Sequence, residues 1–152
     1  MSIKDLEYDD VARIVALGLE FHAESPRFSR QIFDADKVAE WVTAFITEPD
    51  LKGFVAVEKQ GFDMEIVGFM AASIGPTFFG PTLIAVDEVI FVKKSARRSS
   101  VATELMDSYR QWAQSVGAEE INFGMNCQIP GAKKFGEFMG YEKVGFQMVY
   151  RG

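Results

Sequence analysis

DEVIFVKKSARRSSVATELM, residues 87–106, joins an apolar segment to an amphipathic one through a turn of basic and small residues. The apolar and β-branched residues up to Val92 predict a strand, and the apolar spacing after Ser99 predicts a helix. The first N–H groups of a helix have no intrahelical partner, and the helix dipole adds roughly half a positive charge there. This segment therefore predicts an anion cradle between a strand and a helix.

Four basic residues crowd this turn: Lys93, Lys94, Arg97 and Arg98. A run of charge is usually a solvated surface, but its place between a strand and a helix favours anion binding. The rest of the chain is acidic, because the net charge is −6 and residues 1–82 hold seven basic against fourteen acidic side chains. These charges argue against nucleic acid as a partner.

Length and composition set the class of protein. A chain of 152 residues with 48% hydrophobic content predicts one domain, residues 1–152, with its own core. The single cysteine, Cys127, excludes an internal disulfide, and one histidine with one cysteine cannot supply a typical zinc site. No apolar run reaches the roughly 20 residues that span a bilayer, and the acidic N-terminus is unlike a signal peptide. We therefore expect a cytoplasmic protein that uses no metal and binds no membrane.

Helix and strand patterns alternate along the whole chain. The hydrophobic periodicity and the turn residues predict strands at 3–6, 53–58, 66–74, 83–92, 120–125 and 142–150, and helices at 11–21, 34–48, 99–116 and 131–139. The segment 22–33 is predicted as a loop. The strand at 83–92 is apolar except at Asp87 and Glu88, so both of its faces should be covered. This order predicts an α/β fold, a mixed sheet with helices on both faces.

Two motifs in this order resemble the GNAT superfamily of acyl-CoA-dependent N-acyltransferases. The family signature is Arg or Gln, two variable residues, Gly, one variable residue, then Gly or Ala, and residues 97–102 occupy that frame. Residues 132–141 are similar to its second motif, and a strand ending at Asn126 separates the two. The chain thus resembles GNAT-like proteins of bacteria and their phages over nearly its whole length.

The resemblance implies a mixed, mostly antiparallel central sheet of about six to seven strands. It also implies acetyl transfer from acetyl-CoA to a primary amine of a small molecule or peptide, by direct attack in a ternary complex. Many members of the family pair, so a homodimer is left open. The acidic half of this chain would favour a cationic amine as the acceptor.

The resemblance also implies where coenzyme A binds. Backbone amides of the turn would hold the pyrophosphate, with countercharge from Arg97, Lys93 or Lys94. Pantetheine would lie between the strands at 83–92 and 120–125, where a strand amide could stabilise the oxyanion. The cofactor-binding residues expected are Phe91, Val92, Arg97, Arg98, Ser99, Ser100, Val101, Ala102, Thr103 and Asn126.

Two positions depart from the family pattern. Ser100 stands where the family usually has Gly, which places a hydroxyl and a Cβ in the tightest part of the cradle. Gly136 stands where many members have the Tyr that protonates the departing thiolate. A thiol with a pKa of about 8.5 leaves with little protonation, so catalysis can survive this loss. Tyr141, Tyr109 and water are the replacement acids, and Tyr141 is the one we select, although it also fits a core aromatic.

The catalytic base is expected on the strand at 83–92. Glu88 is the best-placed carboxylate to take a proton from the amine. Alternation along a strand puts Asp87 on the opposite face, where it should reach solvent or a charged partner. For the acceptor, the resemblance places the connection between the first two helices at the site. His22 and Phe28 are therefore the substrate-binding candidates, with weaker ones at Glu24, Arg27 and Arg30.

Two other functions remain open at this point. A coenzyme A-binding family member with weak or no catalysis would act as a regulatory or binding protein, and Gly136 is its main support. An interaction protein would keep only the fold and present the acidic residues 1–82 to a basic partner.

Overall fold

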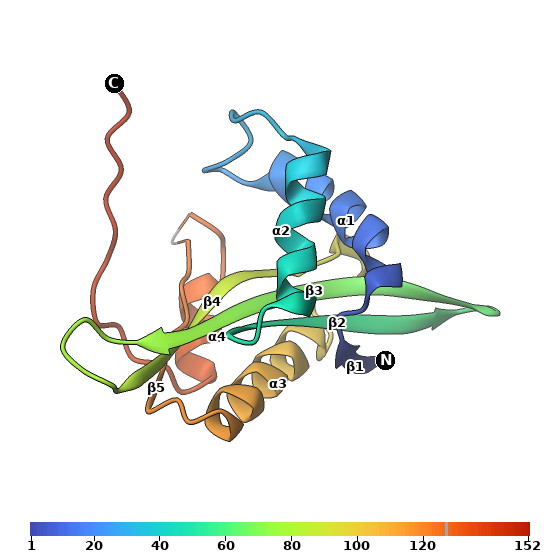
Figure 1. Cartoon of the computed structure of the whole chain (residues 1–152). Helices are drawn as coiled ribbons and strands as arrows, with labels where there is room; N and C mark the ends of the chain where they lie inside the picture. Colours follow the sequence, from blue (N-terminus) through green and yellow to red (C-terminus); the bar gives the residue numbers. More distant parts are fainter. Residues whose placement is uncertain (127) are drawn as a thin grey trace.

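In the described part of the chain, five strands form one sheet, in the order β1-β2-β3-β4-β5 (Figure 1). The first four pair antiparallel with their neighbours, and β5 runs parallel to β4. This computed structural model describes residues 1–126 and 128–152, so Cys127 lies outside the described residues. The strands are β1 (Ser2–Asp5), β2 (Leu51–Gln60), β3 (Asp63–Pro76), β4 (Leu83–Val92) and β5 (Glu120–Ile121).

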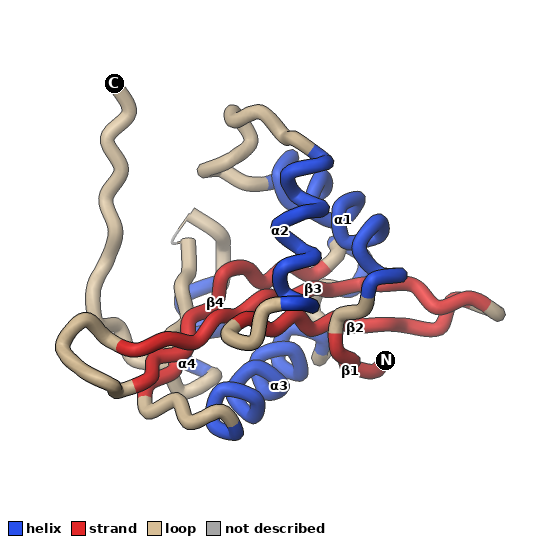
Figure 2. The backbone as a smooth tube through the Cα atoms, in the orientation of Figure 1, coloured by secondary structure: helices blue, strands red, loops and turns tan. Residues whose placement is uncertain are grey.

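Helices cover both faces of the sheet (Figure 2). They are α1 (Val11–Glu24), α2 (Ala35–Thr47), α3 (Val101–Ser115) and α4 (Ala132–Phe138), with short 3-10 turns η1 (Tyr8–Asp10) and η2 (Lys94–Ala96). One core cluster lies between the sheet and α1 with α2, and the other between the sheet and α3. The predicted fold class, a mixed and mostly antiparallel sheet with helices on both faces, is confirmed.

The predicted number of six or seven strands is wrong. Only two residues of the expected strand at 120–125 pair with β4, at Ile84↔Glu120 and Ala85↔Ile121. Residues 142–150 alternate apolar and polar like a strand, yet they run away from the sheet (Figure 1), and Phe146 and Tyr150 are 79% and 94% exposed. An alternating pattern needs a neighbouring strand to pair with, and this segment meets none in the described chain.

The central position in the sheet belongs to β3 rather than β4. Residues 66–72 of β3 are buried continuously, whereas in β4 only Ala85 and Phe91 are buried and Val86 is 38% exposed. The expectation that both faces of β4 are covered is therefore wrong for its middle. Strand β4 also loses its neighbour on one edge there, because its pairing with β5 ends at Ala85.

Capping residues and glycines predicted the ends of the helices more accurately than the alternating pattern predicted the strands. The Asp34 carboxylate accepts a hydrogen bond from the Lys37 N–H at 3.1 Å and caps α2. Gly140, with φ +87°, follows α4 in the left-handed conformation that ends helices. The exception is residues 22–24, which were predicted as a loop and instead form the last turn of α1.

Gly68 of β3 lets α3 approach the sheet closely. A Cβ added at Gly68 would lie 2.9 Å from Val101 Cγ1 and 3.1 Å from Leu105 Cδ1, both in the first turns of α3. Val101 and Leu105 are themselves fully buried. This contact seats the N-terminal end of α3, and with it the basic turn of residues 93–100, against the end of β4.

Candidate functional site

The site lies where strand β4 and the chain that follows β5 diverge. We call the V-shaped opening between residues 86–92 and residues 122–126 the V. The last backbone hydrogen bond between the two runs from Asn122 N–H to the Ala85 carbonyl at 2.9 Å. Beyond it, the edge of β4 from Val86 to Val92 has no ladder partner on this side among residues 1–126 and 128–152. An unpaired strand edge offers backbone N–H and C=O groups to a ligand that enters the V.

Asp87 crosses the V from β4. Its Oδ1 accepts a hydrogen bond from the Gly124 N–H at 2.7 Å. Burial raises the pKa of Asp87 to about 6, although the hydrogen bond from Gly124 acts in the other direction. Asp87 is half-buried, and the solvent contact expected for it is retained in part. Its hydrogen-bond partner is a backbone amide, and no charged partner is found for it among the described residues.

Glu88 and Asp87 lie on opposite faces of the sheet, as predicted. Asp87 pairs with Ala72, which belongs to the core cluster under α3. The register shifts between Ala71 and Ala72, so Glu88 has no cross-strand partner. Its exposed carboxylate accepts a hydrogen bond from the Ser73 hydroxyl at 2.7 Å.

The basic turn leads into the open end of α3. The first backbone bond of the helix runs from Glu104 N–H to the Ser100 carbonyl at 2.9 Å, so the N–H groups of Ala102 and Thr103 are available to a ligand. The Val101 N–H donates to the Ser99 hydroxyl oxygen at 3.3 Å. Helix α3 begins at Val101 rather than at Ser99, and the Ser99 hydroxyl donates to the Ala96 carbonyl at 2.5 Å. Arg98 has φ +66°, a left-handed conformation uncommon for a side chain of this size.

Ser100 fills the position where the family signature has Gly. Its hydroxyl donates to Glu104 Oε1 at 2.6 Å. A carboxylate therefore stands at the rim of the cradle and is held by the residue that departs from the signature. This carboxylate lowers the positive potential at the helix mouth, so the neighbouring cations matter more here.

The basic residues of the turn have different partners. Arg97 Nε donates to the Val92 carbonyl at 3.0 Å, and its Nη2 pairs with Glu24 Oε2 at 2.6 Å. Lys93 pairs with Glu65 of β3, and this hydrogen bond raises the pKa of Lys93. Neither Lys94 nor Arg98 forms an ion pair with any described carboxylate.

The end of α1 lies over the end of β4. Besides the ion pair between Arg97 and Glu24, the rings of Phe21 and Phe91 meet edge to face with centroids 5.3 Å apart. The predicted cofactor residues Phe91, Val92 and Arg97 are thus brought together at one end of the V. Asn126 comes from the other arm of the V, where its side chain accepts a hydrogen bond from Gln128 N–H at 2.9 Å.

The space beside Gly136 is already occupied. A Cβ at Gly136 would lie 2.6 Å from Met125 Cε and 3.4 Å from the Phe123 ring. The Tyr141 hydroxyl is buried and finds no hydrogen-bond partner among the described residues, and burial raises its pKa. Tyr109 is fully buried and donates to the Asn122 carbonyl at 2.9 Å, which is a structural role.

His22 holds the loop between α1 and α2 in place. Its Nε2 lies 2.7 Å from the Gln31 carbonyl, to which it donates, and its ring packs against Phe33 with centroids 5.4 Å apart. Phe28 lies under the Arg27 guanidinium, 5.0 Å from the ring centroid. Both predicted substrate residues therefore shape this loop, and their role toward a substrate stays a prediction.

The loop also lines a cavity of about 510 Å³ that sequence reasoning did not find. We call it the arginine pocket, and its walls are Pro26, Arg27, Arg30, Gln31, Gln128, Val149 and Arg151. Arg27 and Arg30 were weak candidates, but nothing in the sequence linked them to Gln128 or Arg151. About 100 positions or more separate these segments, so no local pattern could have joined them.

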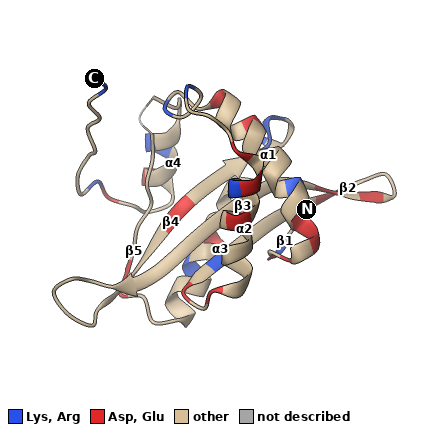
Figure 3. Ribbon diagram, turned by 45° about the horizontal axis from the view of Figure 1, so that its top comes forward, with Lys and Arg blue, Asp and Glu red and all other residues tan. Residues whose placement is uncertain are grey.

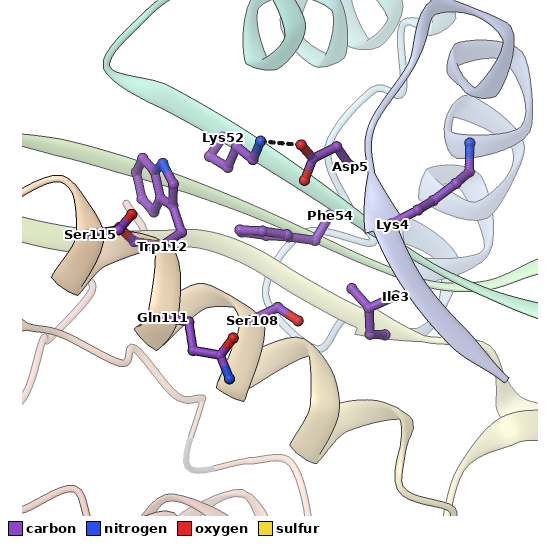
Figure 4. Close-up of a pocket in the computed structure, with 9 residues that line it drawn as sticks. All are labelled: Ile3, Lys4, Asp5, Lys52, Phe54, Ser108, Gln111, Trp112 and Ser115. Atoms are coloured by element: carbon purple, nitrogen blue, oxygen red, sulfur yellow. Dashed lines mark hydrogen bonds and ion pairs between the residues drawn. The ribbon is translucent and has the colours of Figure 1, made fainter.

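A second cavity, of about 430 Å³, lies between β1, β2 and the C-terminal half of α3 (Figure 4). Trp112 and Phe54 line it, and Lys52 pairs with Asp5 at 2.6 Å at its edge. It holds none of the predicted site residues and is far along α3 from the basic turn.

No group of three or more metal-ligating side chains occurs among the described residues. None of the described helices is both long and apolar enough to cross a membrane.

The chain is thus an α/β protein in which an open strand edge lies beside a basic turn at the mouth of a helix, an arrangement that suits a phosphate-bearing ligand. Residues 18–141 match the profile of the Acetyltransferase (GNAT) family, and the chain belongs to this family. No curated protein sequence matches the chain significantly.

Solved structures share the fold at low sequence identity. The chain is 18% identical to a transcriptional regulator from Bacillus halodurans, with a TM-score of 0.79 and coverage of 98% of this chain and 99% of that one. It is 19% identical to AAC(6')-Iy in complex with a bisubstrate analogue, CoA-S-monomethyl-acetylneamine, with a TM-score of 0.79 and coverage of 99% and 97%. An aminoglycoside acetyltransferase from an uncultured soil metagenomic sample, in complex with sisomicin, is 18% identical, with a TM-score of 0.74 and coverage of 99% and 95%.

Proposed function

We propose that this protein transfers an acetyl group from acetyl-CoA to a primary amine. The observation that carries the proposal is the unpaired edge of β4, which ends beside the basic turn and the mouth of α3. Pantetheine is a chain of amides that can hydrogen-bond to such an edge, and a pyrophosphate suits such a helix mouth. Membership of the Acetyltransferase (GNAT) family supports the same chemistry.

The residues of the turn and of the V would bind the co-substrate. Backbone amides of Arg98, Ser99, Ser100, Val101, Ala102 and Thr103 would hold the pyrophosphate, with a charge-assisted contact from Arg97 and unpaired positive charge from Lys94 and Arg98. The backbone of Phe91 and Val92, with Asn126 across the V, would hold pantetheine. A β4 amide aimed at the thioester oxygen would stabilise the oxyanion that forms when the amine attacks.

Glu88 would act as the general base. An ammonium group must lose a proton before its nitrogen can attack, and Glu88 is an exposed carboxylate on the uncovered part of β4. The hydrogen bond from Ser73 fixes one of its oxygens. The other oxygen is then free to accept the proton directly or through a water.

The leaving thiolate needs only weak assistance. Its free pKa of about 8.5 lets it depart with little protonation. Tyr141 stays our proposed acid, with water as the alternative. Its buried hydroxyl and raised pKa make it a weak donor, so its contribution to the rate should be small.

Two measurements test the proposal in sequence. Acetyl-CoA should raise the melting temperature, and thiol release should then accelerate on adding an amine from a panel of amines. The absence of any thermal shift at millimolar acetyl-CoA would refute both coenzyme A binding and catalysis. The Arg13→Gln variant, altered at an exposed position of α1, is the control for changes of surface charge.

One observation favours a second function, a coenzyme A-binding protein with little catalysis. The space beside Gly136 is occupied by Met125 and Phe123, so no acid occupies the position that the family motif gives it. This function predicts a thermal shift with acetyl-CoA and no thiol release with any amine beyond slow hydrolysis.

A further inference from the structure

The arginine pocket is a concentration of positive charge on an acidic protein. The chain carries a net charge of −6, yet Arg27, Arg30 and Arg151 line one cavity that no Asp or Glu lines. In Figure 3, positions of Lys or Arg (blue) occur both on the loop that follows α1 and at the C-terminal end of the chain. None of the three arginines forms an ion pair with a carboxylate of residues 1–126 or 128–152.

Like charges gathered without a counterion repel each other, so their convergence in a cavity calls for an anion. Gln31 and Gln128 add amide groups to the same walls. Guanidinium forks and amide N–H groups are the donors that match the two oxygens of a carboxylate or the three of a phosphate. A polycation would meet repulsion from three sides.

The pocket lies at the mouth of the V. The loop that carries Arg27 and Arg30 continues from the end of α1, which the Arg97–Glu24 ion pair and the Phe21–Phe91 contact hold over the end of β4. Gln128 follows the other arm of the V just after Asn126. A ligand in the pocket would therefore lie close to the open end of the V, beside the end of β4.

The C-terminal segment closes the pocket's third side. Arg27 Nη1 donates to Gln147 Oε1 at 3.1 Å, which links the loop to a segment 120 positions away. Val149 and Arg151 then reach the cavity. The exposed strand-like tail thus has a local role here, since it brings the third guanidinium to the other two.

We propose that the arginine pocket binds an oxyanion, a carboxylate or a phosphate, carried by one of the two substrates. This inference rests on the proposed function and names its substrate class. Either the acceptor is an amine that also bears a carboxylate or phosphate, or the ribose phosphate of coenzyme A reaches the pocket. In the first case the acceptor carries negative charge as well as its amine, so it is not the purely cationic amine that the overall charge of the chain favoured.

The first test uses binding alone and needs no turnover. Glutarate and its neutral analogue glutaramide are titrated calorimetrically into the protein, with and without saturating coenzyme A. We expect glutarate to bind at least about tenfold more tightly, because charge-assisted hydrogen bonds exceed neutral ones by that factor. Arg30→Gln and Arg151→Gln should remove the preference, and Arg13→Gln should keep it.

The second test identifies the source of the oxyanion. Coenzyme A and dephospho-coenzyme A, which lacks the ribose phosphate, are compared on the same variants. If Arg30→Gln and Arg151→Gln weaken binding of coenzyme A about tenfold but leave dephospho-coenzyme A unchanged, the pocket holds the cofactor phosphate. If neither ligand changes, while the KM for 5-aminopentanoate rises relative to 5-aminopentanamide at unchanged kcat, the pocket holds the acceptor.

Equal affinities for glutarate and glutaramide, with coenzyme A discrimination the same in every variant, would overturn the inference. Its failure is distinguishable from failure of the proposed function. Glutarate binding without any thiol release from acetyl-CoA would leave the oxyanion pocket standing and refute catalysis. Thiol release with no preference for anionic probes would support catalysis and refute the oxyanion pocket.

Discussion

The basic turn and the arginine pocket are both rich in positive charge, but they are built in different ways. The turn is one continuous stretch, residues 93–100, whose charges are partly neutralised by Glu24 and Glu65. The pocket draws Arg27, Arg30 and Arg151 from segments at opposite ends of the chain. The turn can therefore be recognised in one local segment of the sequence, whereas the pocket exists only because distant segments meet. Four predictions test this division, and they run from the largest expected effect to the smallest.

The largest effect is expected at Glu88, which belongs to neither region. Glu88→Gln should lower kcat/KM by about 100-fold below the pKa of the amine, because general bases contribute about 10² to 10⁴ in rate. The loss should shrink as the pH approaches the amine's own pKa. Thiol release as a function of pH measures this. Ser73→Ala, which removes only the hydrogen bond to Glu88, is the matched variant and should lose far less. A pH profile identical to that of the parent would remove Glu88 as the base.

The seating of the basic turn depends on Gly68. Gly68→Ala should lower the free energy of unfolding by about 2 kcal/mol, because the added Cβ overpacks against Val101 and Leu105. Urea denaturation measures this, and coenzyme A affinity should fall as α3 shifts. Gly75→Ala is the control in the same strand, since nothing lies within 4 Å of its added Cβ. Equal stability of the two variants would show that close packing there does not position α3.

Charge at the turn should affect cofactor affinity rather than chemistry. Arg97→Ala should weaken coenzyme A binding about tenfold, the usual size of one charge-assisted contact. The kcat at saturating acetyl-CoA should change little. Calorimetry and steady-state kinetics separate the two effects. Arg30→Gln in the pocket is the comparison, and a larger loss of kcat than of affinity in Arg97→Ala would contradict the division.

The smallest effect concerns Asp87, whose carboxylate crosses the V to the Gly124 N–H. The raised pKa of Asp87, about 6 against 3.8, means that the folded state holds the proton more tightly than the unfolded one. This carboxyl therefore stabilises the protein less as the pH rises from about 4 through 6. Asp87→Asn keeps an acceptor for the Gly124 N–H without the charge. Because solvent screens this half-exposed carboxylate, the variant should gain only about 1 kcal/mol at pH 7.5 relative to pH 4. The difference in unfolding free energy between parent and variant at the two pH values is the readout, and a constant difference would contradict the burial of charge.

Local parts of the structure were predictable from the sequence. Strand β4 has the predicted bounds, and the cap at Asp34 and the stop at Gly140 lie where their residue types indicated. The candidate base Glu88 and its neighbour Asp87 were assigned to opposite faces, which the structure confirms. These features depend on capping groups, glycine conformations and strand alternation, all of which act within a few residues.

The features that the sequence did not predict depend on contacts between residues far apart in the chain. Nothing near Asp87 in the sequence indicated that its carboxylate meets the Gly124 amide, which is 37 positions away. The alternation of residues 142–150 indicated a strand, but a strand exists only where another edge pairs with it. The length of β5 was overestimated for the same reason, since its residues beyond Ile121 lose contact with β4.

By itself the sequence determined the family, the turn between β4 and α3, and the residue types available for chemistry. The tertiary structure alone decided where β4 and β5 separate, what Asp87 contacts, and that three arginines converge on one cavity. The physical reason is the range of the interactions. Helix starts, turns and strand faces follow from neighbouring residues, whereas cavities and strand edges depend on how distant segments pack together.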